Sequence, residues 1–136
     1  MQRYHFCEID LAAIRHNVGV MKSHIAGGAR FLAVVKADAY GHGAVPVAKA
    51  ALEAGADMLA VAIPEEGIEL RKAGIAAPIL VLGGIEESAA EAVVQYNLTQ
   101  VVFDESRIPD LDYVNGMCNY LAKVGELYFI ETKEGG

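Results

Sequence analysis

The 136-residue sequence has no tryptophan, only two cysteines and no long apolar run. A membrane-spanning helix needs about 20 mainly apolar residues, so we expect no membrane association. The first ten residues, MQRYHFCEID, lack an apolar signal core, which predicts a cytoplasmic protein. Cys7 and Cys118 lack the spacing of metal ligands, so we expect two reduced cysteines in structural, buried positions and no metal site.

Basic residues are also scarce. The chain has 11 lysines and arginines against 18 aspartates and glutamates, a net charge of -7, and its basic residues form no stripe. Nucleic acid is therefore not an expected partner. The 54% content of hydrophobic residues predicts instead a folded domain with a substantial core.

Short, β-branched apolar runs recur along the chain and are typical of parallel strands buried on both faces. Five are found: FLAVVK (31–36), DMLAVAI (57–63), APILVLG (77–83), LTQVVF (98–103) and ELYFIET (126–132). The segments between them have helical spacing, notably 43–55, 64–74 and 86–97. In the second of these, Pro64 suits a first helical position and Arg71 suits the helix end. The alternation predicts βαβ units in a parallel sheet.

Two α/β architectures fit this alternation, a (β/α) barrel and an open doubly wound sheet. Gly41-His42-Gly43 falls short of the GxGxxG dinucleotide fingerprint. This absence favours the barrel.

Lys36 ends the first apolar run and is followed at once by ADAYGHG. In a strand over 31–36 it would share a face with Leu32 and Val34 and stand at the carboxyl end, which in a barrel is the catalytic rim. An amine held there can form an imine with an aldehyde cofactor. The alternative is a lysine that reaches solvent just beyond the strand.

The motif AVVKADAYGHG (33–43) resembles the alanine racemase family, the pyridoxal-phosphate enzymes of fold type III. Similarity extends through IDLAAIRHNV (9–18), through residues 52–84 and through LTQVVFD (98–104), about three-quarters of the chain. The resemblance implies a homodimeric isomerase that interconverts L-alanine and D-alanine and supplies D-alanine for peptidoglycan. It also implies a partial (β/α)8 TIM-type barrel, with about five of the eight parallel strands in this chain.

The resemblance also implies roles for individual residues. Lys36 matches the lysine that forms an imine with pyridoxal 5'-phosphate and acts as one of two bases at the alanine Cα. Tyr40 matches the tyrosine that reaches the cofactor phosphate, and Val34 would pack beneath the cofactor. Asp38 and His42 are expected to shape the loop.

The second base of the family is a tyrosine in a carboxy-terminal β-domain, delivered by the partner subunit. We expect residues 1–136 to represent the amino-terminal portion of the barrel, without that domain. In the tail, Ile130, Glu131 and Thr132 match the I-D-T of a KIDTGMGR-like family motif, but Phe129 and Gly136 replace its lysine and arginine.

Two alternatives stay open beside the racemase interpretation. One is a pyridoxal-phosphate-binding single-barrel protein that does not racemise, although AYGHG after the lysine is the racemase form of the motif. The other is an inactive fragment that self-associates, since an open sheet leaves unpaired strand edges. In each case we expect a homo-oligomer.

Overall fold

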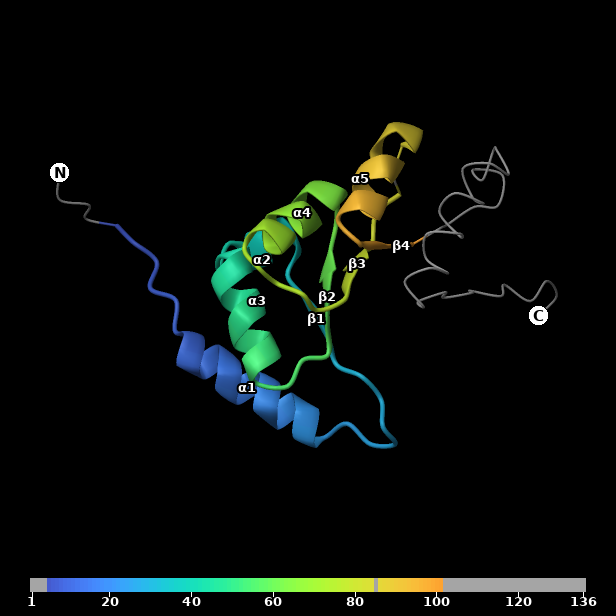
Figure 1. The fold of residues 1–136 in the computed structure, drawn as a ribbon. Helices are drawn as coiled ribbons and strands as arrows, with labels where there is room; N and C mark the ends of the chain where they lie inside the picture. Colours follow the sequence, from blue (N-terminus) through green and yellow to red (C-terminus); the bar gives the residue numbers. More distant parts are fainter. Residues whose placement is uncertain (1–4, 85, 102–136) are drawn as a thin grey trace, which may run out of the picture. The chain divides into compact units, whose positions relative to one another are not determined.

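The computed structural model describes residues 5–84 and 86–101, which lie within one compact unit, Met1–Val101 (Figure 1). Helices and strands alternate along it as the sequence predicts. In chain order the elements are α1 (Leu11–Ser23), β1 (Leu32–Val34), α2 (Lys36–Tyr40), α3 (Ala44–Glu53), β2 (Met58–Val61), α4 (Pro64–Lys72), β3 (Ile79–Val81), η1 (Glu87–Ala89), α5 (Ala90–Gln95) and β4 (Thr99–Gln100). The predicted strand 126–132 and the tail motif lie outside the described residues.

The four described strands form one parallel sheet in the order β1-β2-β3-β4. Leu32 pairs with Met58 and Leu59 pairs with Ile79. A doubly wound sheet reverses its strand order at a switch point, and these four strands contain no reversal. The α/β class with a parallel sheet is confirmed, and the four described strands lie side by side in the order in which they occur in the sequence.

The core lies between the sheet and the helices that cover it. The fully buried side chains include Leu59 and Val61 of β2, Ile79 of β3, Leu70 of α4 and Leu98. Helix α4 approaches the sheet closely at Gly67, where an added Cβ would lie 3.0 Å from both methyl carbons of Leu98.

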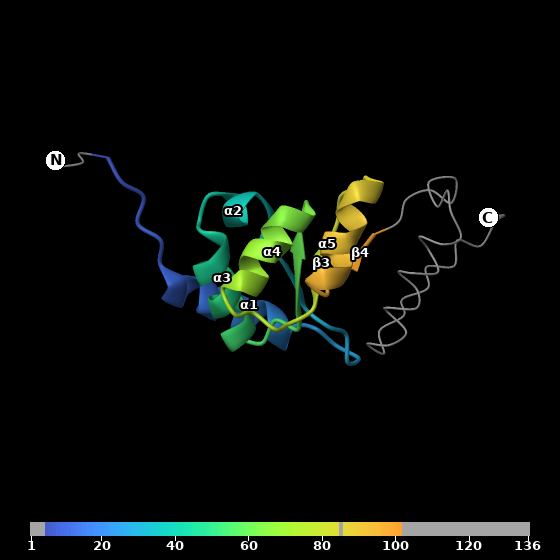
Figure 2. The same ribbon diagram turned by 45° about the horizontal axis from the view of Figure 1, so that its top comes forward.

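Helix α1 was not predicted from the sequence. The side chain of Asp10 begins it by accepting a hydrogen bond from the backbone N–H of Ala13 at 3.0 Å. The helix packs against α3, as Figures 1 and 2 show. The contact is a hydrophobic cluster around buried Val18, Ala51 and Ala56.

One prediction about buried residues concerns the two cysteines. Cys7 is exposed, so its predicted burial is wrong; Cys118 lies outside the described residues.

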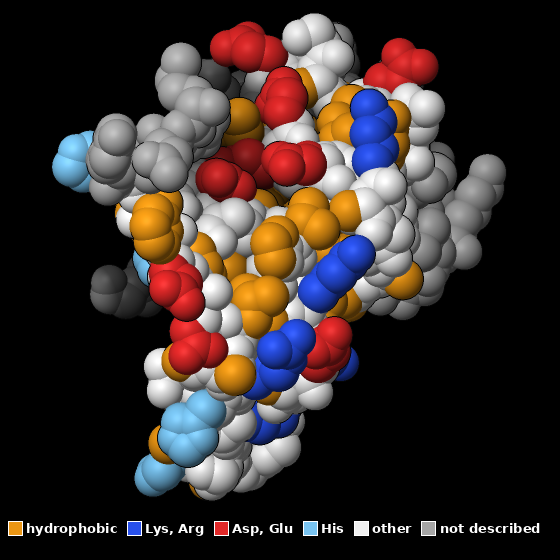
Figure 3. Space-filling model, turned by 90° about the vertical axis from the view of Figure 1, so that its left-hand side faces the viewer, with side chains coloured by type: hydrophobic (Ala, Val, Ile, Leu, Met, Phe, Trp, Pro, Cys, Tyr) orange, Lys and Arg blue, Asp and Glu red, His pale blue; other side chains and the backbone are white. Residues whose placement is uncertain are grey.

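Hydrophobic side chains are exposed in the middle of the face in Figure 3, and acidic side chains gather above them. No helix in the described ranges is both long and apolar enough to cross a bilayer.

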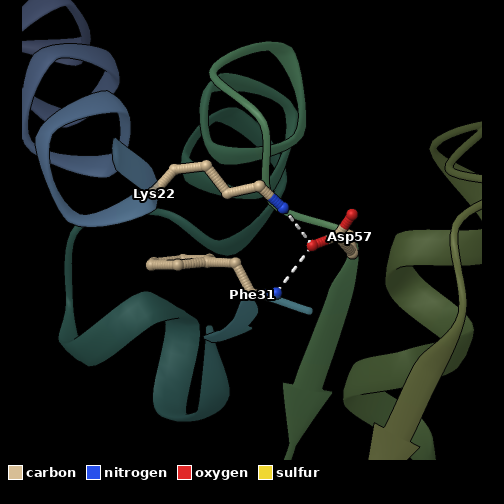
Figure 4. Close-up of polar contacts among 3 residues, drawn as sticks. All are labelled: Lys22, Phe31 and Asp57. Atoms are coloured by element: carbon tan, nitrogen blue, oxygen red, sulfur yellow. Dashed lines mark hydrogen bonds and ion pairs between the residues drawn. The ribbon is translucent and has the colours of Figure 1, made fainter. Parts of the chain in front are cut away.

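A polar cluster at the amino ends of β1 and β2 joins three segments of the chain (Figure 4). The carboxylate of Asp57 accepts a hydrogen bond from the backbone N–H of Phe31 at 2.6 Å and forms an ion pair with Lys22 of α1. In return, the backbone N–H of Asp57 donates to the carbonyl of Phe31. The cluster therefore links α1 to the start of both strands.

We expect this cluster to make stability depend on pH in the acid range. The hydrogen bond from Lys22, followed by that from the Phe31 N–H, lowers the pKa of Asp57 below its ordinary value of 3.8. Because the folded-state pKa is the lower one, the stabilisation is complete above about pH 5 and is lost as the pH falls below 3.8. Urea unfolding of wild type and Asp57→Asn between pH 7 and pH 2 should show a stability difference that shrinks toward acid.

The surface pair Arg15–Glu53, with an N–O distance of 2.7 Å, supplies the matched control. Both side chains are exposed, so Glu53→Gln should change stability little at any pH. A difference between wild type and Asp57→Asn that stays constant down to pH 2 would contradict the assignment.

Candidate active site

Lys36 lies just past the carboxyl end of β1, which is shorter than predicted. The strand ends at Val34 rather than at Lys36, although the N–H of Val35 still donates to the carbonyl of Ala60 in β2 at 2.8 Å. Within residues 5–84 and 86–101, the Lys36 amine has no hydrogen bond or ion pair. A half-buried amine at the end of a parallel strand is thus left available for a ligand.

The element labelled α2 is not a right-handed helix, because the residues after Lys36 form a left-handed turn. Ala37, Asp38, Ala39 and Tyr40 all have φ between 51° and 55°. Left-handed backbone costs a residue with a Cβ about 1–2 kcal/mol, and four such residues in succession are rare. Strain of this kind occurs mainly at functional sites, where surrounding contacts hold it in place.

Asp38 supplies several of those contacts. Its carbonyl oxygen accepts hydrogen bonds from the N–H groups of Gly41 and Gly43, at 3.1 and 2.9 Å. Its side-chain Oδ1 accepts one from the N–H of Ala44, the first residue of α3, at 2.8 Å. Asp38 therefore shapes the loop, as predicted, and also caps α3.

Glu66 of α4 holds the other side of the turn. Its Oε1 accepts a hydrogen bond from the N–H of Ala37 at 2.7 Å. Its Oε2 accepts two, from Ala62 at 2.6 Å and from Ile63 at 3.2 Å. One carboxylate thus connects the segments that follow β1 and β2. An acidic residue in the first turn of a helix is common because it suits the helix dipole, so the sequence alone does not reveal the contact with Ala37.

The other two predicted site residues lie on the same short segment. Tyr40 ends the left-handed turn with its side chain 61% exposed, and Val34 ends β1 with its side chain 39% exposed. Neither side chain is buried by the described part of the chain, so both are open to a ligand at this end of the sheet.

The carboxyl ends of β2, β3 and β4 are also drawn together. The N–H of Gly83 donates to the carbonyl of Ala62 at 2.9 Å, and the amide of Gln100 donates to the carbonyl of Gly83 at 2.6 Å. A Cβ at Gly83 would lie 2.5 Å from the Ala62 oxygen, so only glycine fits. The sequence predicts a strand through Gly83, whereas β3 ends at Val81.

Comparison with known proteins gives a consistent family. The protein-family model described as "Alanine racemase, N-terminal domain" matches residues 9–117. Alanine racemase of Symbiobacterium thermophilum is 54% identical over 99 residues, which are 73% of this chain and 26% of that protein. Alanine racemase 1 of Bacillus subtilis is 53% identical over 94 residues, 69% of this chain and 24% of that protein.

Solved structures agree with this result. The alanine racemase of Bacillus anthracis with bound L-Ala-P has a TM-score of 0.76 at 33% identity, and the match covers 91% of this chain and 39% of that one. The Clostridium difficile enzyme in complex with cycloserine has a TM-score of 0.75 at 36% identity, covering 93% and 32%. The chain spans about a quarter of the length of the curated relatives named above.

Proposed function

The chain belongs to the family described as alanine racemase, N-terminal domain, and from that premise we propose that it carries the pyridoxal-phosphate-binding part of an enzyme that interconverts L-alanine and D-alanine. In this proposal the sheet is the first part of a (β/α)8 barrel, and residues 1–136 are its amino-terminal portion. The observation that carries the proposal is the Lys36 amine, without a partner in the described residues, beside a strained turn at the carboxyl end of a parallel sheet.

The residues at this end of the sheet fit the cofactor. Imine formation with the cofactor aldehyde requires an amine nucleophile, and Lys36 supplies one that forms no ion pair with a described carboxylate. A phosphate requires hydrogen-bond donors, and the exposed phenol of Tyr40 is one. Val34 offers a partly exposed apolar surface for the ring.

The reaction requires removal of the alanine Cα proton and its return to the opposite face. Bound pyridoxal phosphate supplies a conjugated system that accepts the electron pair left at Cα. Lys36 would hold the cofactor and take or return the proton on its own face. The opposite face needs a second base, which the family resemblance assigns to a tyrosine outside this chain.

Homo-oligomer formation is part of the proposal. Leu32 and Val34 project from β1, an edge of the described sheet, and are 36% and 39% exposed. Unpaired strand edges with apolar side chains favour pairing with another chain.

Covalent capture tests the proposed role of Lys36. The chain is incubated with pyridoxal 5'-phosphate and reduced with borohydride, and the pyridoxyl group is located by peptide mass spectrometry. We expect it on Lys36, with loss of the visible absorbance band in Lys36→Ala. Lys49 lies exposed on α3, so Lys49→Ala is the matched control and should leave both signals unchanged. Labelling confined to other lysines would reject the role.

A further inference from the structure

The carboxylate of Glu66 spans the distance between two strand ends. It lies in the first turn of α4, three residues after Ile63, which precedes the helix. Its bonds to the N–H groups of Ala62 and Ile63 remain local, as in half of a capping box. Its bond to Ala37 joins residues 29 positions apart. That second contact is not needed to begin α4.

The N–H of Ala37 belongs to the peptide unit that follows the Cα of Lys36. A hydrogen bond to this N–H therefore sets the orientation of that peptide plane, and with it the backbone ψ angle of Lys36. Bonds between an amide and a carboxylate are about twice as strong as those between neutral groups. The 2.7 Å bond from Ala37 to Glu66 also holds the first residue of the left-handed turn in place.

We propose that Glu66 is a positioning residue that aims the Lys36 side chain by fixing the Lys36–Ala37 peptide. This inference rests on the proposed function, in which Lys36 captures the cofactor. Helix α4 thereby connects the end of β2 to the reactive lysine, and Glu66 acts without touching the cofactor itself. The residue is half-buried and bonds only to backbone groups among the described residues.

Two variants distinguish the bond from Glu66 to Ala37 from its bonds at the start of α4. Glu66→Asp is one methylene shorter, so we expect it to keep the bonds at the start of its own helix and to lose the reach to Ala37. Glu66→Gln replaces one oxygen with an amide nitrogen that cannot accept. Because the remaining oxygen can satisfy two donors at Ala62 and Ile63 but only one at Ala37, we expect it to keep the two local bonds and to lose the bond to Ala37. Glu65 lies beside it on α4 and is exposed. Glu65→Gln is thus the control for charge and helix position.

The experiment measures three quantities on the full 136-residue chain. The first two, which need no cofactor, are the amide exchange rate of Ala37 and the Cα and Cβ chemical shifts of Lys36. The third is the rate at which pyridoxal 5'-phosphate is captured at Lys36. In both Glu66 variants we expect Ala37 exchange to accelerate about tenfold, the Lys36 shifts to move, and capture to slow by about tenfold or more. Glu65→Gln should match wild type.

Other results would overturn either the inference about Glu66 or the proposed function. Unchanged Ala37 exchange and Lys36 shifts in Glu66→Asp and Glu66→Gln would overturn the inference. Faster Ala37 exchange with unchanged capture would overturn it too, because Glu66 would then be only structural. If wild type is not captured at Lys36, the proposed function fails, and the two cofactor-free measurements decide the inference by themselves.

Discussion

Replacing Arg71 with methionine is expected to lower the free energy of unfolding by about 3 kcal/mol. Among the described residues, the guanidinium donates to the backbone carbonyls of four. Its Nε bonds Tyr96 at 2.9 Å, its Nη1 bonds Ile75 and Ala77 at 2.8 and 2.7 Å, and its Nη2 bonds Asn97 at 2.9 Å. These carbonyls come from the turn after α4 and from the end of α5, so the variant leaves acceptors of two segments unpaired.

A lysine is expected to restore only part of this stability. Its ammonium is a compact charge on a flexible stem, whereas the planar guanidinium fork reaches several carbonyls at once. Arg71→Lys should therefore lose about 2 kcal/mol, measured by urea unfolding at pH 7. Lys72 is the exposed neighbour, and Lys72→Met should stay within about 0.5 kcal/mol of wild type. Equal stability of the Arg71→Met and Lys72→Met proteins would contradict the structural role.

The sequence predicts the position of Arg71 in its helix but not its hydrogen-bond partners. Its position near the end of a helix was predicted from the favourable interaction of a cation with the helix dipole. Two of its acceptors within the described residues lie 25 and 26 residues further along the chain, and no local pattern identifies them. Helix α1 was not predicted because its sequence has only a weak apolar periodicity. In the structure, Val18 is the one buried residue among its 13.

The four described strands were predictable because each lies in an apolar run of the kind found in parallel sheets. Only β2 and β3 are largely buried within the described residues. The ends of the strands were not predictable, since β1 stops two residues short of Lys36. Lys36, Tyr40 and Val34 were found through a motif, and their roles stay predictions. The left-handed turn was not foreseen, because alanine and tyrosine have no local preference for positive φ. Distant contacts, such as that from Glu66 to Ala37, hold it.

Introducing valine at Ala39 is expected to lower the free energy of unfolding by about 3 kcal/mol. Ala39 has φ 51° and is 5% exposed, so two effects combine. Alanine already bears the cost of a Cβ in left-handed backbone, but a β-branched residue is a more severe outlier there, and its strained rotamer adds about 1 kcal/mol. Two extra methyl carbons in a filled site add about 1–3 kcal/mol more. Urea unfolding measures the sum.

Ala37 separates the two effects, because it has the same φ of 51° but an exposed side chain. Ala37→Val should therefore lose only the added strain of the β-branched side chain, about 1 kcal/mol. Glycine tolerates positive φ, so Ala39→Gly should stay close to wild type, since relief of strain offsets the larger freedom of the unfolded chain. If Ala37→Val proves neutral, the turn is not left-handed in solution. If instead both valine variants lose stability and slow the capture of pyridoxal 5'-phosphate at Lys36 while still folded, the strained backbone and the reactive lysine belong to one site.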